Sequence, residues 1–475
     1  MTNNILVDKI EEIRTRNLGI CIRSLKLCDN EIYILFIPQL SDKQSLCDNI
    51  IRPLINHKRE DMNIETIFHS IISMDEVLLE DNADFFTSHI LRGKTVIVNS
   101  SDNKYIVANT LQIESRQISP PELQGGLRVP KDCFNENFDS NISLIRYRIK
   151  DEKLKIDTSS VGRRTKTALA IIYIEDIVDN KLLKEVKEKI SAIDVDGILD
   201  SGYIQKYLEK NTNSFFPKIA IAERSDKACA SLLNGEICII VEGSSLALCF
   251  PEALVEFLDS GDDNYDKSYV GIFATFIRII SMLIALTSSS IYVALVSFHP
   301  EALPPYYILA LANYRASVPT SAFFEAFLME LVVEILREAS IRLPKQIGSA
   351  IGIVGTIVIG QAAVAAGLVS PLMVIIISLA TLASFSVTDY TITHPLRLLK
   401  FVMIASTALL GIYGFILTLT FIAAYLISYR TYDTNYLYPI EPLNLKDLKH
   451  YLYKNIATTK DRISYLNLKN KRRQK

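Results

Sequence analysis

The sequence predicts a soluble α/β N-terminal region made of two related α/β subdomains, followed by an α-helical integral membrane domain and a short basic tail. Three observations support this prediction. Charge is uneven along the 475 residues: the net charge is −10 over 1–270, +2 over 271–430 and +6 over 431–475. Three long runs in the middle block contain no charged residue. Finally, the first block repeats one order of strands and helices twice.

The composition excludes several classes of protein. Hydrophobic residues make up 49% of the chain and charged residues 22%, and the mean hydropathy is +0.21. These values exclude a disordered chain and a small disulfide-bonded secreted domain, and the uncharged runs exclude a wholly soluble enzyme. The first residues, MTNNILVDKIEEIRTRN, include no apolar stretch of signal-peptide length. The seven cysteines form no C-x-x-C pair. We therefore expect the α/β region to lie in a reducing, cytoplasmic compartment.

An internal duplication organises the first half. The stretch GKTVIVNSSDNKYIVA from Gly93 matches GEICIIVEGSSLALCF from Gly235, because each consists of a glycine, an apolar strand, a polar turn and a second strand. Each copy follows a short helical segment. Upstream, the strands EIYILFI and ALAIIYI are each followed by a helix. The predicted units are a first subdomain over 1–112, a linker over 113–164 and a second subdomain over 165–265.

The membrane domain is predicted over 266–430. A bilayer core of about 30 Å requires about 20 apolar residues per helix. The uncharged run 279–300 extends backwards to form one span, and the run 401–429 supplies the last. The run 346–388 is too long for one helix and is broken by a glycine and a proline. The predicted spans are about 274–297, 347–366, 370–387 and 401–428.

The segment 306–342 is predicted to be interfacial or re-entrant. Acidic residues recur in it at helical spacing, with arginines nearby and apolar residues on the other side. One interpretation is an interfacial helix whose charges face water. The other is a charged vestibule that lines an ion path and takes part in gating, because ionisable residues beside membrane spans often mark such paths. The vestibule residues would be Glu330, Glu334, Arg337 and Glu338.

The predicted span 347–366 is rich in glycine and β-branched residues. Gly348 and Gly352, four residues apart, favour close packing between helices. The same helix also carries a narrow, mostly apolar strip at i, i+3/i+4 spacing, and in a ring of copies such a strip closes a pore by dewetting. Packing and pore lining therefore both stay open for this helix. The predicted pore-lining residues are Ser349, Ile353, Thr356, Gly360 and Val364.

Orientation follows from the basic residues. The tail 431–475 contains ten Lys and Arg, which predicts a cytoplasmic location. Because the N-terminal region is expected on the same side, the number of spans must be even, and four satisfies this condition. Four spans place Arg397 and Lys400 in an outer loop, where basic residues are disfavoured.

The α/β region contains no convincing catalytic motif. Gly93-Lys94-Thr95 resembles the end of a phosphate-binding loop but lacks the required upstream glycine and leads from a helix into a strand. Arg163, Arg164 and Lys166 form a basic cluster that is either a solvated loop or an anion site. The six histidines are scattered. We therefore expect no enzymatic activity, no cofactor, no metal site and no nucleic-acid partner.

Several motifs follow one another in an order that resembles a known family. They are VGRRTKT, DGILDSGYI, FPKIAIAERSDKA, SFHPEALPP, ILREASIRLPKQIGSA and VIGQAAVAAGLVSPLMVI. Together they look like the A subunit of the GerA-type spore germinant receptors, a spore germination protein. The resemblance covers about residues 30–440.

The resemblance implies a protein of the spore inner membrane, and the orientation predicted above then places its N-terminal domain and tail on the spore-core side. It implies a transporter-like B subunit and a lipoprotein C subunit as partners, and homo-oligomers that form a nutrient-gated ion channel. Two alternatives stay open: a non-conducting scaffold that transmits the signal, and the related germination channel of the dipicolinic-acid transport operon. DGILDSGYI and REASIRLP favour the receptor group over the latter.

Overall fold

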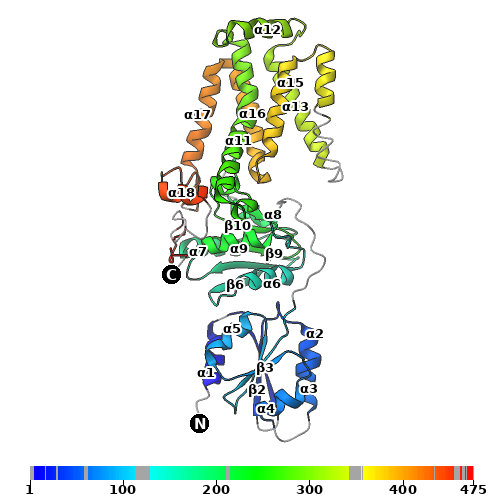
Figure 1. Cartoon of the computed structure of the whole chain (residues 1–475), viewed down its shortest axis with the longest axis vertical. Coiled ribbons are helices and arrows are strands. Elements are labelled where there is room, and N and C mark those ends of the chain that lie inside the picture. The colour runs from blue at the N-terminus through cyan, green and yellow to red at the C-terminus, as the bar shows by residue number, and fades with distance from the viewer. Residues whose placement is uncertain are drawn as a thin grey trace.

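A computed structural model gives the fold of most of the chain. Figure 1 shows two α/β units and a helical bundle that follow one another along the long axis of the molecule. The N-terminus lies at the end of the first unit, and the C-terminus lies beside the second unit. The structure describes residues 5–16, 18–27, 30–57, 62–112, 129–209, 214–341, 355, 357–432, 434–453, 461–462, 466 and 468–473.

The first unit is a five-stranded antiparallel sheet with helices on both faces. Its sheet has the order β1-β2-β4-β5-β3. The elements are α1 (Ile5–Arg16), β1 (Cys21–Leu27), β2 (Asn30–Phe36), α2 (Lys43–Ser45), η1 (Leu46–Ile51), α3 (Arg52–Asn56), α4 (Ile64–Thr66), η2 (Ile67–Ile71), β3 (Val77–Glu80), η3 (Ala83–Phe85), α5 (Phe86–Leu91), β4 (Thr95–Asn99) and β5 (Tyr105–Ala108).

The second unit has the same architecture. Its strand order, β6-β7-β9-β10-β8, corresponds position by position to that of the first sheet. The elements are α6 (Phe138–Arg148), β6 (Leu154–Val161), β7 (Thr167–Ile174), α7 (Asn180–Ser191), α8 (Ser201–Glu209), β8 (Ala220–Ala222), α9 (Ser225–Asn234), β9 (Ile237–Val241), β10 (Ala247–Phe250), α10 (Leu254–Phe257) and η4 (Gly261–Asn264).

The central strands show why each unit has helices on both faces. All five residues of β4 are buried. Val96 and Val98 belong to a core under α1 and α5, whereas Ile97 belongs to a core under α3, η1 and η2. Alternate side chains of a strand point to opposite faces, so an uninterrupted apolar strand requires cover on both sides. The predicted duplication into two related α/β subdomains is therefore confirmed by the two sheets.

The predicted linker is too long. Its described part, 129–164, contains α6 and β6, which belong to the second unit and correspond to α1 and β1 of the first. The second unit therefore begins before residue 165. This start could not be recognised from the sequence. Strand β6 lies at the sheet edge and is half-exposed, so its residues lack the strong apolar pattern of the central strands.

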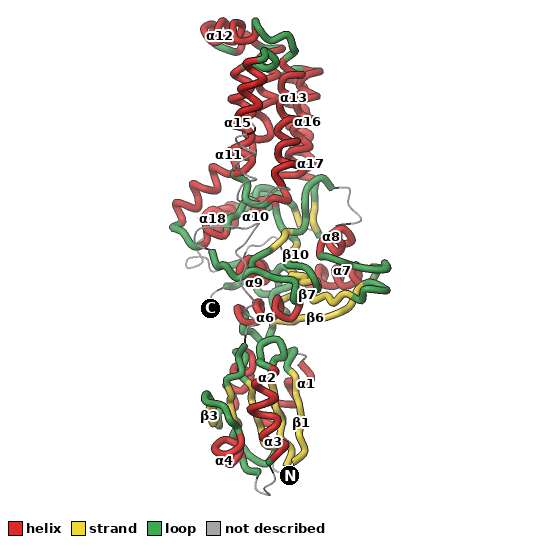
Figure 2. Tube along the Cα trace, turned by 90° about the vertical axis from the view of Figure 1, so that its right-hand side faces the viewer, coloured by secondary structure: helices red, strands yellow, loops and turns green. Residues whose placement is uncertain are grey.

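The C-terminal half is a bundle of helices. Its elements are α11 (Ser268–Ser297), η5 (Pro300–Ala302), α12 (Pro305–Arg315), α13 (Ala322–Ile341), a helical stretch over 357–365, α15 (Pro371–Phe385), α16 (Tyr390–Leu410) and α17 (Ile412–Ser428). Helix α11 packs against α13, α15, α16 and α17. Figure 2 shows these helices running side by side, with α12 across the end farthest from the α/β units.

The bundle differs from the predicted spans in two places. A single helix over about 401–428 does not form, because the chain turns at Gly411, which has a φ of 63°. Helix α16 runs away from the second unit and α17 returns to it, so that Tyr429 donates a hydrogen bond to the carbonyl of Phe216. The segment predicted as interfacial or re-entrant, 306–342, divides into α12 at the bundle end and α13 inside the bundle.

By length and composition, α11 is the one helix among the described residues that suits a membrane crossing. Its 30 residues extend about 45 Å. Helices α15 and α17 are apolar but shorter, with 15 and 17 residues. Helices α13 and α16 carry charged residues within their apolar sequences.

The basic tail folds back onto the second unit instead of extending freely into solvent. After β11 (Arg430–Thr431) and β12 (Thr434–Asn435), helix α18 (Leu445–Tyr453) packs against α11. Leu466 and Leu468 belong to the core of the second unit. The Arg462 guanidinium donates a 2.8 Å hydrogen bond to the Leu233 carbonyl, at the C-terminal end of α9. The tail therefore ties the end of the bundle to the second unit.

Candidate functional site: a charged network inside the helical bundle

Helix α13 turns its acidic side towards the bundle interior. The Glu325 side chain is 0% exposed and Glu330 is 2% exposed. The apolar residues Leu331 and Ile335 are instead exposed on the outer surface of the bundle. Helix α13 is therefore not an interfacial helix with all of its charges in water, since Glu325 and Glu330 are buried inside the bundle.

Lys400 of α16 pairs with Glu330. Its Nζ lies 2.5 Å from Glu330 Oε2, and the Ser289 hydroxyl donates a 2.6 Å hydrogen bond to Glu330 Oε1. Lys400 is 6% exposed, so both charges are buried. Burial of a single charge costs several kcal/mol, whereas a close pair with a further hydrogen bond offsets most of that cost. Each member of this pair therefore depends on the other.

A second ion pair lies one helical turn further along. Arg397 of α16 and Glu334 of α13 are in contact, and both are largely shielded from solvent. The two cations are three residues apart on α16, and the two acids are four residues apart on α13. Such spacings place each set on one helix face. Arg397 and Lys400, predicted in an outer loop, thus lie inside a helix and face the acids of another.

Glu325 forms the far end of the network. Its Oε1 accepts a 2.5 Å hydrogen bond from the backbone N–H of Ser370, and its Oε2 accepts one of 3.2 Å from the Tyr292 hydroxyl. The Tyr292 and Ser370 hydroxyls are 2.9 Å apart. Within the described part of the chain, Glu325 forms no ion pair. The acids of α13 from Glu325 to Glu334 therefore extend the network over about 14 Å of the bundle.

Arg337 and Glu338 lie near the other end of α13. The Arg337 guanidinium donates a 2.8 Å hydrogen bond to the Ser384 hydroxyl and lies over the Phe385 ring. Glu338 is exposed. Of the four predicted vestibule residues, Glu330 and Glu334 thus join the interior network, Arg337 contacts α15, and Glu338 faces outwards.

Most of the predicted pore strip lies outside the described residues. This holds for Ser349, Ile353 and Thr356, and also for the packing pair Gly348 and Gly352. Gly360 is buried, and a Cβ added to it would lie 2.8 Å from Val374 Cγ1 of α15. Val364 packs partly buried in the same core. Within one chain, Gly360 faces α15 and Val364 packs on the bundle core, so their role in lining a pore remains a prediction about an assembly.

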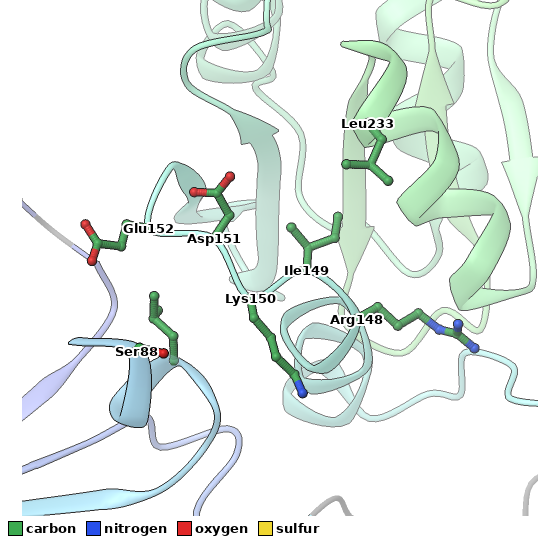
Figure 3. Close-up of a pocket in the computed structure, with 8 residues that line it drawn as sticks. Ser88, Arg148, Ile149, Lys150, Asp151, Glu152 and Leu233 are labelled. Carbon is green, nitrogen blue, oxygen red and sulfur yellow. The ribbon is translucent and has the colours of Figure 1, made fainter. Parts of the chain in front are cut away.

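A pocket of about 460 Å³ lies where the two α/β units meet. Figure 3 shows Ser88 from the first unit facing residues 148–152 and Leu233 of the second, with the Arg148 guanidinium pointing away from Asp151 and Glu152. This guanidinium instead binds Asp132 at 2.7 Å and Ser225 at 2.8 Å. The charged groups of the pocket therefore do not converge on one point. In the predicted basic cluster of Arg163, Arg164 and Lys166, the Arg163 guanidinium is likewise taken up by an ion pair, with Asp194.

Sequence reasoning identified the acids of α13 but missed their partners. Ser289, Tyr292 and Ser370 gave no signal, because serine and tyrosine are common in apolar helices. Arg397 and Lys400 did give a signal. If the apolar runs on either side of them form one helix, these two cations are buried and require acidic partners.

Comparison with known proteins identifies the family of the chain. Residues 8–464 match the family model described as Bacillus/Clostridium GerA spore germination protein. Spore germination protein KA of Bacillus subtilis (strain 168) is 34% identical over 440 residues, which cover 92% of this chain and 81% of the relative. Spore germination protein GerLA of Bacillus cereus is 35% identical over 439 residues, 92% of this chain and 89% of the relative.

A further relative and one crystal structure are also similar. Spore germination protein A1 of Bacillus subtilis (strain 168) is 33% identical over 452 residues, 95% of this chain and 91% of the relative. The crystal structure of the N-terminal domain of the A subunit of the Bacillus megaterium spore germinant receptor GerK3 is 28% identical, with a TM-score of 0.42, and covers 52% of this chain and 95% of that chain. The match over almost the whole sequence places the chain in the GerA family of spore germination proteins.

Proposed function

We propose that this chain is the membrane-embedded A subunit of a spore germinant receptor and that several copies surround a nutrient-gated ion channel in the spore inner membrane. Its partners would be a transporter-like B subunit, a lipoprotein C subunit and further copies of itself. It would act without enzymatic activity. The α/β units and the tail would face the spore core.

The observation that carries the proposal is the presence of two ion pairs inside the helical bundle. Glu330–Lys400 and Glu334–Arg397 join α13 to α16. Ionisable residues are costly inside a membrane and typically mark ion paths or switches. If these ion pairs open and close together, they give the bundle two discrete arrangements, and a gate requires such a pair of states.

A charge-swapped variant tests this role. In Glu334→Arg/Arg397→Glu, the two charges still attract each other, whereas Glu334→Arg alone juxtaposes two cations. We expect the swapped variant to accumulate normally and to change the ion selectivity or gating of purified protein in liposomes. If the pair only holds the helices together, the swap will restore wild-type single-channel behaviour.

The conductance itself separates a channel from the alternative of a non-conducting scaffold. Purified full-length protein in liposomes, alone and with its B and C partners, should show discrete single-channel events. Silent membranes under all of these conditions would favour the scaffold. The predicted pore strip is tested in the same system: Ile353→Ala or Val364→Ala should leak without nutrient, and cysteines at these positions should react with a water-soluble thiol reagent, in contrast to cysteines at Ile351 or Ile359.

A further inference from the structure

The second α/β unit is joined to the bundle at a buried cluster of charged groups. Lys227 of α9 lies 3.5 Å from Asp389, the residue that caps the N-terminus of α16. The same Nζ lies 4.0 Å from Glu252, which follows β10. Beside this contact, the Thr388 hydroxyl donates a 3.1 Å hydrogen bond to the Phe257 carbonyl. Lys227 is thus shared between an acid of its own unit and an acid of the bundle.

More acids than cations face this point. Glu252 is 4% exposed and Glu236, which precedes β9, is 2% exposed. Glu252 Oε2, Glu236 Oε2 and the Tyr436 hydroxyl have no hydrogen-bond partner among the described residues. Buried polar atoms are nearly always paired, so three unpaired atoms in one neighbourhood mark this junction as strained or functional. The groups that face the two glutamates are Lys227, Ser231, Cys249, Glu256, Asp389 and Tyr436.

Electrostatics favours the neutral form of both glutamates. Burial, together with Glu256 and Glu252, raises the pKa of Glu236 well above its ordinary value of 4.5. Burial also raises the pKa of Glu252; Lys227 opposes this shift, while Glu256 and Asp389 add to it. Because the folded protein holds these protons more tightly than the unfolded chain, their contribution to stability is complete below pH 4.5 and is lost as the pH rises through the raised pKa.

We propose that Glu236 and Glu252 form a proton-binding site that controls the contact between the second α/β unit and α16. With both glutamates neutral, Lys227 pairs with Asp389 and holds the start of α16 against the unit. Loss of a proton places a new negative charge beside Asp389, repels it and divides Lys227 between two acids. Because α16 also carries Arg397 and Lys400, a change of protonation at the junction acts through this helix on the ion pairs of the bundle.

Hydrogen exchange of the full-length protein in detergent or nanodiscs tests the proposal. Protection factors, corrected for the intrinsic exchange rate at each pH, are compared between roughly pH 5.5 and pH 8.5 for the start of α16 and for α9. In the wild type, protection should fall severalfold over this range, with a limit of about tenfold per pH unit for one coupled proton. In Glu236→Gln/Glu252→Gln, which mimics the neutral form, protection should stay high and nearly independent of pH.

Two further variants keep the result interpretable. Glu242→Gln removes an exposed carboxylate from the same unit and should retain the wild-type pH dependence. If the double glutamine variant does not fold, Asp389→Asn replaces it, and the pH dependence at the start of α16 should disappear because the repelled charge is absent. A pH-independent wild type, or an unchanged pH dependence in the glutamine or asparagine variant, overturns the proposal. Because the readout is local protection, this outcome is separate from whether the protein conducts ions.

Discussion

At the scale of single residues, the partner decides what a buried glutamate does. On α13, Glu330 has a lysine at 2.5 Å and Glu334 has an arginine, whereas Glu325 has a backbone N–H and a tyrosine hydroxyl. The first two acids tie α13 to α16, and the third ties α13 to α11 and to the start of α15. The same residue type, repeated along one helix, therefore holds three different neighbours.

Removing one member of the Glu330–Lys400 pair should destabilise the protein more than removing both. Lys400→Met leaves the buried side chain of Glu330 without its cation, which should cost about 3–5 kcal/mol. The double variant Glu330→Gln/Lys400→Met leaves no unpaired charge and should recover most of that loss. Thermal unfolding in detergent measures both effects. As a control, Arg164→Met removes an exposed cation of the second unit and should cause little change. Additive losses in the double variant would show that the two side chains do not interact.

At the scale of elements, the sequence predicted the α/β units better than the bundle. The pairs β4–β5 and β9–β10 were recognisable because apolar strands, glycines and polar turns follow one another locally. Helix α16 was not recognisable, because Pro395, Arg397 and Lys400 interrupt its apolar pattern. The two cations can be buried in the bundle only because acids of α13 face them. Likewise, the turn at Gly411 lies within an uncharged run, where composition gives no sign of a break. Patterns that depend on a distant partner cannot be read from one segment.

Close approach between the 357–365 helix and α15 depends on Gly360. A Cβ there would lie 2.8 Å from Val374 Cγ1, closer than packed atoms allow. Gly360→Val should therefore force the helices apart and cost about 1–3 kcal/mol through overpacking. Reducing the partner in Gly360→Val/Val374→Ala should relieve part of this cost, as measured by thermal unfolding. Equal stability of the single and double variants would mean that the two helices do not meet here.

At the scale of the whole molecule, both ends of the helical bundle are attached to the second α/β unit. Helix α11 leaves the second unit, α17 comes back to it at Tyr429, and the tail continues along it to Leu468. Residues from α16, α17 and the tail share one hydrophobic core with α6 and α9 of the second unit. A movement of this unit therefore acts on the bundle through several attachments at once, and the Lys227–Asp389 contact is one of them.

This arrangement predicts which parts of the chain lie on each side of a membrane. Because α12 lies at the bundle end farthest from the α/β units and the tail lies beside them, an embedded bundle separates α12 from both (Figure 1). Three exposed tyrosines provide matched positions: Tyr306 of α12, Tyr203 of the second unit and Tyr453 of the tail. Each is replaced by cysteine in a background without other cysteines. In intact cells, a membrane-impermeant maleimide should label Tyr306→Cys alone.

Lysis of the cells should then expose Tyr203→Cys and Tyr453→Cys to the same reagent, because the proposed orientation places the second unit and the tail together on the cytoplasmic side. The two ends of the helical bundle can both lie beside the second unit only after an even number of crossings, and this condition is satisfied because α11 leaves that unit and α17 returns to it. Labelling of Tyr453→Cys but not Tyr203→Cys in intact cells would require an odd number, and the packing of the tail on the second unit would then be wrong. Labelling of both but not Tyr306→Cys would keep the fold and reverse its orientation.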